Sequence, residues 1–520
     1  MSGKVITIIG GGASSVSMIH SLLNGIEKKN TKENLTIFMI EKRSGFGRGL
    51  AYSEDVTTNL LNTKAGFITP FTDRPGHFYQ WLDENRTVWE DDFPDIDINQ
   101  DAFLPRPLFG HYLSNMVQHL CSRALSLECR LIPVKDEAIR LSFSHDGHVV
   151  VSTKNNLSFS SDHVVVSCGN GGSLEYSALD GEKNFFSSPY PVKRTARNVP
   201  KDARVAIIGS RLSAIDTVLG LKKNGHTGKI TLHSRTGALP SVRGSQGRYQ
   251  PQYLTLEKVH AHLKKHNEIR LGDVITWVIQ ELAAAGENIK LSPDNLIANC
   301  TQPNPLDYLK SEIIKAKSPR LWQAVLYATN SIIDLVWASM PEEDKKKFWP
   351  YFSWWVTYRV SIPVENAIKM RDLLLNKEMA IIPGTVSIIK EKDSFIVKTQ
   401  HETVVKNYEY DVVIAATGTP RNIKYLDNPL VQDMLEQKIA TPNPFGGIDV
   451  TISSGNIINA NGNIDERITV LGELTSGTFL FTSVLEINAR HAADRAQNIL
   501  AKLEKLNLPK EDKDQMRRVG

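Results

Sequence analysis

Residues 6–20, ITIIGGGASSVSMIH, join a run of β-branched residues directly to three glycines and then to an amphipathic pattern. The run Val5 to Ile9 predicts a strand that is buried on both faces, as in a parallel sheet. Gly10 to Gly12 permit a turn too tight for any side chain and let another group approach the backbone. After the turn, apolar residues recur at helical spacing: Val16, Ile19, Leu22, Leu23 and Ile26. The N-terminus of such a helix presents free N–H groups and a partial positive charge, which suit a phosphate.

The residues that follow complete a dinucleotide-binding pattern. Its glycine spacing is Gly10-x-Gly12-x-x-Ser15, with a small serine in place of the usual third glycine. Residues 35–40, LTIFMI, predict a second buried strand, and Glu41 ends that strand. A carboxylate at this place accepts hydrogen bonds from the ribose hydroxyls of adenosine and repels a 2′-phosphate. The alternative is a tight strand-to-helix turn followed by a surface glutamate.

A degenerate copy of this pattern occupies residues 204–221, RVAIIGSRLSAIDTVLGL. A buried strand leads into Gly209, and Ser213 begins the next helix, while Arg211 takes the place of the second glycine. The second copy therefore predicts another nucleotide-binding turn, although a weaker one than the first.

The strand after this second turn, KITLHSR at residues 229–235, ends in a serine and an arginine instead of an acid. The Ser234 hydroxyl and the Arg235 guanidinium suit a 2′-phosphate through charge-assisted hydrogen bonds. Arg243 lies close enough in sequence to act as a second phosphate ligand. We therefore expect FAD at the first turn and NADPH at the second, with a plain surface arginine as the alternative for Arg235.

Composition narrows the class of protein and its partners. A chain of 520 residues predicts two to four domains, and its 41% hydrophobic and 23% charged residues are typical of a soluble globular protein. Basic and acidic side chains are nearly balanced, 61 against 57, and no basic cluster indicates nucleic acid or an anionic membrane as a partner. Homo-oligomerisation is left open by the sequence.

Targeting signals and cysteine usage indicate the compartment. No stretch approaches the roughly 20 apolar residues that a membrane span needs, and Met1 to Lys4 leave no room for a signal peptide. The four cysteines form no C-x-x-C pair and have no metal-ligand spacing with histidine. We therefore expect a cytoplasmic protein without a metal site, and not a dithiol-disulfide reductase.

The fold class predicted is α/β, with two Rossmann-like dinucleotide-binding domains and a helical insertion that contains five tryptophans, Trp322, Trp337, Trp349, Trp354 and Trp355. These tryptophans either pack a core or wall a water-excluding pocket. The expected boundaries are residues 1–195 and 406–510 for the FAD domain, 200–250 and 379–405 for the NADPH domain, 251–378 for the helical insertion and 511–520 for a solvated tail.

Segments along nearly the whole chain resemble the FAD/NAD(P)-binding family of two-dinucleotide-domain flavoproteins, which is related to flavin-dependent monooxygenases. They are GGGASS with Glu41, GFGRGLAY with LLNTKAG, LPRPLFGHYL, IIGSRLSAIDTVLGL, ITLHSRTGALPSVR, KKKFWPYFSWWVTYRVSI and ATGTP. Some members of this family N-hydroxylate small amino acids, and others hydroxylate heteroaromatic rings such as urate.

The resemblance also implies roles for individual residues. The FAD pyrophosphate and adenosine ribose would be held by Gly10, Gly12, Ala13, Ser14, Ser15 and Glu41. Contacts near the ribityl chain and the isoalloxazine would come from Arg48, Asn62 and Gly472 to Thr475. NADPH would be held by Gly209, Ser210, Ser213, Ser234 and Arg235. Arg106 and Gly418 are further candidates for cofactor contact, and a surface ion pair is the alternative for Arg106.

The resulting prediction is an NADPH-dependent flavin monooxygenase that uses O2 to N-hydroxylate a small amino acid or amine through a C4a-hydroperoxyflavin. An amino-acid carboxylate needs a cationic partner, and the candidates are Arg243, Arg248, Arg320 and Arg359. Three alternatives are a hydroxylase of a small heteroaromatic compound, an FAD-dependent NADPH oxidoreductase without oxygen insertion, and a non-enzymatic FAD-binding protein.

Overall fold

The computed structural model describes residues 3–29, 34–169, 171–287, 302, 304–401 and 403–507. The predicted solvated tail, residues 511–520, and Cys300 lie outside these described residues. Among the helices described, none combines the length and the apolar composition that crossing a bilayer requires.

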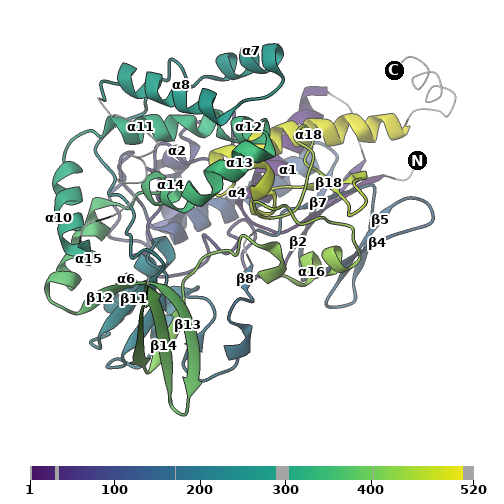
Figure 1. Ribbon diagram of the computed structural model, residues 1–520. Coiled ribbons are helices and arrows are strands. Elements are labelled where there is room, and N and C mark those ends of the chain that lie inside the picture. Colours follow the sequence, from purple (N-terminus) through teal and green to yellow (C-terminus); the bar gives the residue numbers. More distant parts are fainter. Residues whose placement is uncertain are drawn as a thin grey trace.

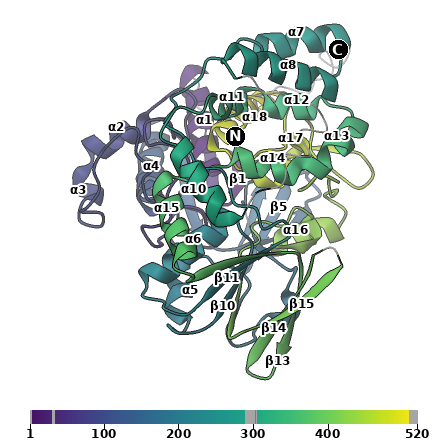
Figure 2. The ribbon, with the colours of Figure 1, turned by 60° about the vertical axis from the view of Figure 1, so that its left-hand side comes forward.

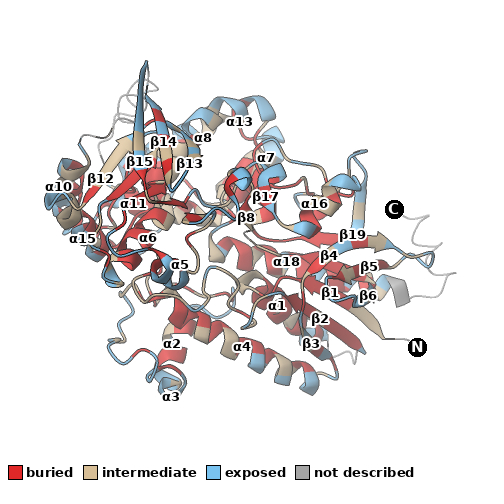
Figure 3. Cartoon of the chain, turned by 90° about the horizontal axis from the view of Figure 1, so that it is seen from below, coloured by how far each residue is buried: buried red, intermediate tan, exposed pale blue. Residues whose placement is uncertain are grey.

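A six-stranded sheet forms the centre of the first nucleotide domain, in the order β18-β19-β7-β1-β2-β3, and only β18 is antiparallel to its neighbour. The strands are β1 (Lys4–Ile9), β2 (Leu35–Glu41), β3 (Arg130–Lys135), β7 (His163–Val166), β18 (Asn456–Ile458) and β19 (Ile464–Val470). As the β-branched pattern predicts, the inner strands are buried (Figure 3). Strands β18 and β19, from the segment predicted to return to the first domain, pair within this sheet.

The first helix, α1 (Ala13–Lys29), packs its apolar face against the C-terminal helix α18 (Leu485–Asn507). At Gly25 a Cβ would lie 2.4 Å from the Leu500 Cδ1 atom, so the absence of a side chain there allows the two helices to approach closely. Three further helices flank this domain, α2 (His77–Glu84), α3 (Arg86–Trp89) and α4 (Arg106–Ser126). The first and last parts of the chain thus share one core.

A second sheet is parallel throughout, in the order β12-β11-β10-β16-β9. Its strands are β9 (Phe185–Phe186), β10 (Val205–Ile208), β11 (Ile230–Ser234), β12 (Met379–Pro383) and β16 (Val412–Ala415). Two predicted boundaries are therefore wrong. Residues 185–186 belong to this sheet and not to the first domain, and the second domain extends beyond residue 405 to include β16. The physical reason is strand pairing, because β16 takes the position beside β10 that completes the sheet.

Helices α5 (Val192–Asn198), α6 (Leu212–Lys223), α10 (Pro305–Lys315) and α15 (Val364–Leu375) accompany the second sheet. Apolar side chains of α10 and α15, including Leu309 and Met370, are fully buried in the same core as those of β10 and α6. Parts of the segment 251–378, predicted as a separate helical insertion, therefore belong structurally to the second domain.

Six further helices form a layer above the second sheet, with α7 and α8 farthest from that sheet (Figures 1 and 2). They are α7 (Leu256–His266), α8 (Leu271–Ala284), α11 (Leu321–Ala328), α12 (Ile333–Ala338), α13 (Glu342–Phe348) and α14 (Phe352–Arg359). Trp337 and Trp349 pack with Phe445 of the first domain, and the Trp337 indole donates to the Gly477 carbonyl at 2.8 Å. These two tryptophans therefore fix the helical layer to the first domain.

Smaller antiparallel elements complete the fold. One sheet consists of β4 (Ala138–Phe143), β5 (Val149–Thr153) and β6 (Ser158–Ser161), and another of β13 (Thr385–Glu391), β14 (Ser394–His401) and β15 (Val404–Tyr410). The latter extends away from the second sheet (Figures 1 and 2). Short strands β8 (Gly172–Ser173) and β17 (Leu426–Asp427) pair near α16 (Pro429–Glu436), and the short helix α17 (Ser476–Phe479) precedes α18.

Polar contacts connect the two nucleotide domains. The Arg106 guanidinium, at the start of α4, lies 2.8 Å from the Asp216 carboxylate of α6, and Tyr190 donates to the same carboxylate at 2.8 Å. Asp216 is almost fully buried. Burial alone would lower the pKa of Arg106, but the Asp216 carboxylate raises it above its ordinary value. For Arg106 the structure thus contains the ion pair that the sequence left as an alternative, and the pair joins two domains.

Replacing Asp216 by alanine is expected to lower the free energy of unfolding by about 3 kcal/mol, because it leaves a buried guanidinium without its counterion. Urea denaturation followed by circular dichroism measures this loss. The matched control is Asp83→Ala, which removes an exposed partner of Arg86 and is expected to cost less than about 1 kcal/mol. Equal losses in the two variants would contradict the role given to the Asp216 pair.

Candidate functional site

The two glycine turns have the same backbone geometry. Gly10 has φ +110° and a Cβ there would lie 2.3 Å from the Ser167 carbonyl oxygen, just after β7. Gly209 has φ +130° and a Cβ there would lie 2.5 Å from the Ala416 carbonyl oxygen, just after β16. Each turn therefore requires glycine for two reasons: the positive φ angle of the residue and the close approach of the neighbouring strand end.

Free backbone donors follow the first turn. The N–H groups of Gly12, Ala13 and Ser14 have no acceptor within the described part of the chain, and no acidic residue lies in the first turn of α1. The loop at residues 45–49 lies against this turn, where the Gly47 N–H donates to the Gly11 carbonyl at 2.6 Å. Three N–H groups at the positive end of a helix of 17 residues suit a diphosphate.

Glu41 lies at the end of β2, in a hollow next to the first turn. Its Oε2 atom accepts from the Gly11 N–H at 2.9 Å and its Oε1 atom accepts from the Arg43 N–H at 2.9 Å, so the carboxylate is held in place. The hollow is lined by Gly10, Glu41, Lys42, Arg43, Asp136, Glu137, Cys168 and Asn428, among others. Its three carboxylates outnumber its two cations, Lys42 and Arg43, which pair with Glu137 and Glu41, so the net negative charge disfavours a 2′-phosphate there.

The C-terminal part of the chain closes over the first turn. A Cβ at Gly472 would lie 3.4 Å from the Ser14 Oγ atom, so Gly472 and Ser14 are neighbours, as the predicted set requires. The Thr475 hydroxyl donates to the Gly472 carbonyl at 2.8 Å. The Ser15 hydroxyl donates to the Gly10 carbonyl at 2.6 Å and contacts Ser167 at 2.7 Å, and the side chain is fully buried. Ser15 therefore acts on the turn itself instead of facing a ligand, which corrects its predicted role.

Free donors also follow the second turn. The N–H groups of Leu212, Ser213 and Ala214, at the start of α6, have no acceptor among the residues described. Arg211 directs its guanidinium to α14, where it contacts the Ser353 hydroxyl at 2.7 Å and the Thr357 hydroxyl at 3.1 Å. The residue that weakened the sequence motif therefore connects the second turn to the helical layer.

The end of β11 carries the predicted phosphate ligands. The Ser210 hydroxyl contacts the Ser234 hydroxyl at 2.9 Å and donates to the Ala238 carbonyl at 2.7 Å, so Ser210 stabilises the loop. Arg235 is exposed and no hydrogen bond or ion pair is recorded for it in the described structure. Burial, and then the charge of Arg235, lower the pKa of Arg211. Positive charge is therefore concentrated beside the second turn. Gly418 lies after β16, exposed and with open space where a Cβ would be.

Arg48 and Asn62, both predicted to lie near the flavin, form polar contacts with other residues of the protein. The Arg48 guanidinium contacts the Ser114 hydroxyl at 3.0 Å and pairs with Glu54 at 3.1 Å. The Asn62 carbonyl accepts from the Arg243 Nη2 atom at 2.8 Å. This last bond brings a loop of the second domain to the LLNTKAG segment of the first.

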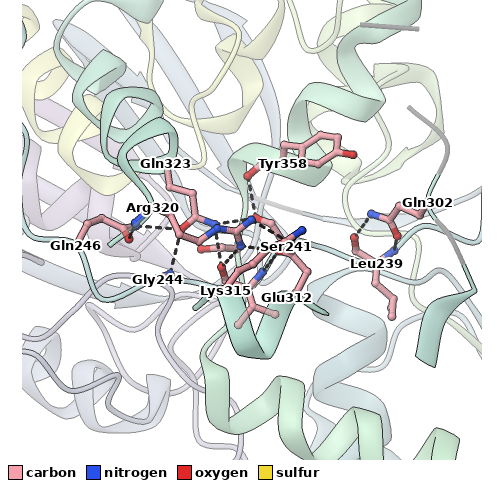
Figure 4. A network of polar contacts seen from close by, with 12 residues as sticks. Leu239, Ser241, Gly244, Gln246, Gln302, Glu312, Lys315, Arg320, Gln323 and Tyr358 are labelled. Carbon is pink, nitrogen blue, oxygen red and sulfur yellow. Dashed lines mark hydrogen bonds and ion pairs between the residues drawn. The ribbon is translucent and has the colours of Figure 1, made fainter. Parts of the chain in front are cut away.

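The four candidate carboxylate ligands have different surroundings. Arg320 is buried and its guanidinium is paired bidentately with Glu312, at 2.5 Å and 2.9 Å, inside a network with Gln323 and Ser241 (Figure 4). Arg320 is therefore not free to bind a substrate carboxylate, which corrects the prediction. Arg248 is exposed, and its guanidinium lies 4.8 Å from the centre of the Phe67 ring.

Arg243 and Arg359 both face Tyr327, with Cζ atoms 3.7 Å and 5.2 Å from the centre of its ring. Neither has an ion pair in the part of the chain that the structure describes, and burial lowers the pKa of Arg359 to about 10. A cation–π contact is worth about 0.5–2 kcal/mol, whereas an unpaired buried charge costs several kcal/mol. The aromatic surroundings alone therefore do not compensate these two charges.

Arg421 was missed by the sequence analysis. Its guanidinium lies 3.8 Å from the centre of the Phe352 ring, and its charge is opposed by the nearby Glu473. Arg421 and Glu473 line a second hollow together with Gly169, Thr419, Gly447 and Ser476, between the segments that follow β7, β16 and β19. The only available signal was its position just after ATGTP. Asp136, also missed, follows β3 as Glu41 follows β2, so strand order would have indicated it.

Comparisons with known proteins agree with this geometry. Residues 7–171 match a family model described as FAD-NAD(P)-binding. No curated protein matches the sequence. Among solved structures, an ornithine hydroxylase from Pseudomonas aeruginosa has a TM-score of 0.56 at 14% identity, covering 96% of this chain and 100% of the other. An L-lysine 6-monooxygenase from Pseudomonas syringae has a TM-score of 0.56 at 15% identity, covering 96% and 99%.

A third structure, an ornithine N-hydroxylase from Kutzneria sp. 744 whose title records reduced FAD, NADP+ and L-ornithine, has a TM-score of 0.54 at 14% identity, covering 96% and 100%. At this identity the likeness concerns the fold, and it confirms the predicted α/β class with two Rossmann-like domains. Residues 7–171 are therefore similar to a FAD-NAD(P)-binding family, and the whole chain shares its fold with these three hydroxylases.

Proposed function

We propose that this protein is an NADPH-dependent flavin monooxygenase that N-hydroxylates a small amino acid or amine. The observation that carries the proposal is the contrast between the two turns. Both leave backbone N–H groups without an acceptor among the described residues, but carboxylates outnumber cations at the first turn, whereas two arginines lie near the second. A carboxylate-rich hollow favours the unphosphorylated ribose of FAD, and Arg235 with Arg211 nearby favours the 2′-phosphate of NADPH.

The residues present fit both groups. FAD would be held by the free N–H groups at Gly12 to Ser14 and by Glu41, and NADPH by those at Leu212 to Ala214 and by Arg235. Bound flavin supplies hydride acceptance from NADPH and the activation of O2, so the protein needs no acid–base pair of its own for that chemistry. Within the described residues, no three potential metal-ligating side chains come together.

The chain contributes position and a protected environment. The segment Gly472 to Thr475 covers the first turn, and Trp337 and Trp349 fix the helical layer over the same domain. The hollow lined by Arg421 and Glu473 lies between the segments that follow one strand of the second sheet and two of the first. Exclusion of water from such a place favours oxygen transfer to an amine over the release of peroxide. The three similar solved structures act, by their titles, on ornithine or lysine, which supports an amine substrate.

The proposal predicts substrate-stimulated consumption of NADPH and O2 in a one-to-one ratio by the flavin-loaded protein. A panel of amino acids and small amines is scored by absorbance at 340 nm, an oxygen electrode and mass spectrometry of the product. Appearance of product heavier by one oxygen atom supports N-hydroxylation. NADPH consumption without matching O2 loss would instead indicate a reductase, and an oxygenated ring product would indicate a heteroaromatic hydroxylase.

Arg235→Gln is expected to raise the KM for NADPH at least tenfold and to leave the KM for NADH nearly unchanged, because only NADPH carries the 2′-phosphate. Loss of one charge-assisted hydrogen bond costs about 1.5–3 kcal/mol, which is roughly tenfold or more in affinity. Lys229→Gln, an exposed position at the start of the same strand, is the control and should change neither constant. Equal effects of Arg235→Gln on both nucleotides would remove Arg235 from the phosphate site.

Glu41→Arg is expected to reduce flavin occupancy of the purified protein several-fold, since it removes the acceptor of the Gly11 N–H and reverses the charge of the hollow. The ratio of absorbance at 450 nm to that at 280 nm measures occupancy. Glu84→Arg, an exposed reversal on α2, should retain the flavin of the unaltered protein. Unchanged occupancy in the Glu41 variant would place the flavin elsewhere.

A further inference from the structure

Two arginines that form no ion pair with any described residue, the buried Arg359 and the partly buried Arg243, lie where three parts of the fold meet. Arg243 belongs to the loop after β11, Arg359 ends α14 and Tyr327 is on α11, between them. The Arg243 guanidinium donates to Asn62 of the first domain at 2.8 Å, and the ring of Phe481, from the segment before α18, lies 5.3 Å from Arg359 Cζ. The two guanidiniums are thus beside the segments that the family resemblance places near the flavin ring.

Some N–H donors of Arg243 and Arg359 form no hydrogen bond with the described residues. The Nε and Nη1 atoms of Arg359 and the Nε atom of Arg243 are buried, and the part of the chain that the structure describes offers them no acceptor. The one side-chain acceptor recorded for Arg359 is Asn330 Oδ1. Arg359 is only 2% exposed, so water does not replace the absent acceptors. Buried donors that lack acceptors at a charged group are costly, and a ligand with carboxylate oxygens would satisfy them.

The charge balance indicates how many negative groups such a ligand carries. The distances to the Tyr327 ring limit the separation of the two Cζ atoms to at most about 9 Å, so each charge destabilises the other, and the positive charge of Arg243 does lower the pKa of Arg359. Glu486 is the carboxylate whose charge reaches Arg359, but it accepts from the Asn330 amide at 3.3 Å and forms no ion pair with the guanidinium. One carboxylate on a ligand would leave a net positive charge, whereas two would neutralise the pair.

Other arginines use their donors within the protein: even Arg495, which is buried and has no ion pair among the described residues, donates to the Val470 carbonyl and has no buried donor left without an acceptor. Arg320 pairs with Glu312, and Arg211 donates to three oxygen atoms of α14. The Tyr327 hydroxyl is bonded to Ser361 at 2.7 Å, so it does not serve the arginines as an acceptor. Arg243 and Arg359 therefore differ from the arginines that stabilise the fold.

We propose that Arg243 and Arg359 bind the two carboxylates of a small dicarboxylic amino acid, which is the substrate class of this protein. That the amine of this ligand is hydroxylated rests on the proposed function. That the ligand binds here rests on the two guanidiniums. A diamino acid is disfavoured, since its side-chain ammonium would be brought close to two buried cations.

Binding is tested on the flavin-loaded protein without NADPH, in a buffer free of phosphate and sulfate and at constant ionic strength. The probes are L-aspartate, L-glutamate, succinate and glutarate, compared with L-alanine and L-ornithine by isothermal titration and thermal unfolding. At least one acidic probe is expected to bind ten times more tightly than L-alanine and to raise the Tm, with L-ornithine the weakest. No binding of any acidic probe, or tighter binding of L-ornithine, would overturn the inference.

Variants assign the binding to the two arginines. Arg243→Gln and Arg359→Gln are each expected to weaken the best acidic probe at least tenfold, and Arg359→Lys, which keeps the charge, is expected to lose less. Arg371→Gln on α15, which removes a partner of Asp372 on the same helix, is the control and should bind normally. Unchanged affinity in both glutamine variants would refute the assignment.

Stability separates a binding role from a structural one, even if one variant folds poorly. Without ligand, Arg359→Gln should not lower the Tm, because it removes a buried charge that lacks a counterion, whereas Arg320→Gln should lower it by disrupting the pair with Glu312. A comparable fall in both variants, with acidic-probe affinity retained in Arg243→Gln, would make Arg359 a structural residue. Tight binding of an acidic amino acid that fails to stimulate NADPH oxidation would support the binding site and contradict the proposed N-hydroxylation.

Discussion

The arrangement of this protein depends on backbone N–H groups at the start of α1 and α6 that have no acceptor among the residues described. Each set follows a glycine turn pressed against the end of a neighbouring parallel strand, at Ser167 in one sheet and Ala416 in the other. A side chain at Gly10 or Gly209 would collide with backbone atoms, so both turns are fixed by packing before any ligand is considered. The donors are in place because the sheets hold the helix ends, and a diphosphate is the group that suits them.

The two glycine turns have similar backbone conformations, and the distribution of charge around them distinguishes the two domains. Carboxylates follow β2 and β3 at the first turn, and arginines stand beside the second. The two domains are then connected by polar groups removed from water, above all Arg106 with Asp216 and Arg243 with the Asn62 carbonyl. Because such contacts are sensitive to geometry, they define how the second domain faces the first.

Buried arginines in this fold have two kinds of surroundings. Arg320 has a carboxylate within hydrogen-bond distance, whereas the buried Arg495 donates to the Val470 carbonyl and forms no ion pair with a described residue. Arg243 and Arg359 contact aromatic rings and carbonyl or amide oxygens instead, and some of their buried N–H donors have no acceptor among the described residues. The free-energy cost of burying a cation without an ion partner exceeds the stabilisation that a cation–π contact provides. An anionic ligand therefore explains these two arginines better than packing does.

The sequence by itself determined the local units. Residues 6–20 define a strand, turn and helix, Glu41 ends β2 and Arg235 directly follows β11, because periodicity and glycine placement are local properties. Tertiary structure decided the rest. It placed β9 and β16 in the second sheet and directed the Ser15 hydroxyl toward the glycine turn. It also paired Arg320 with Glu312 and Arg106 with Asp216. Which arginine keeps a free donor depends on partners distant in sequence, so only the packed chain distinguishes Arg359 from Arg320.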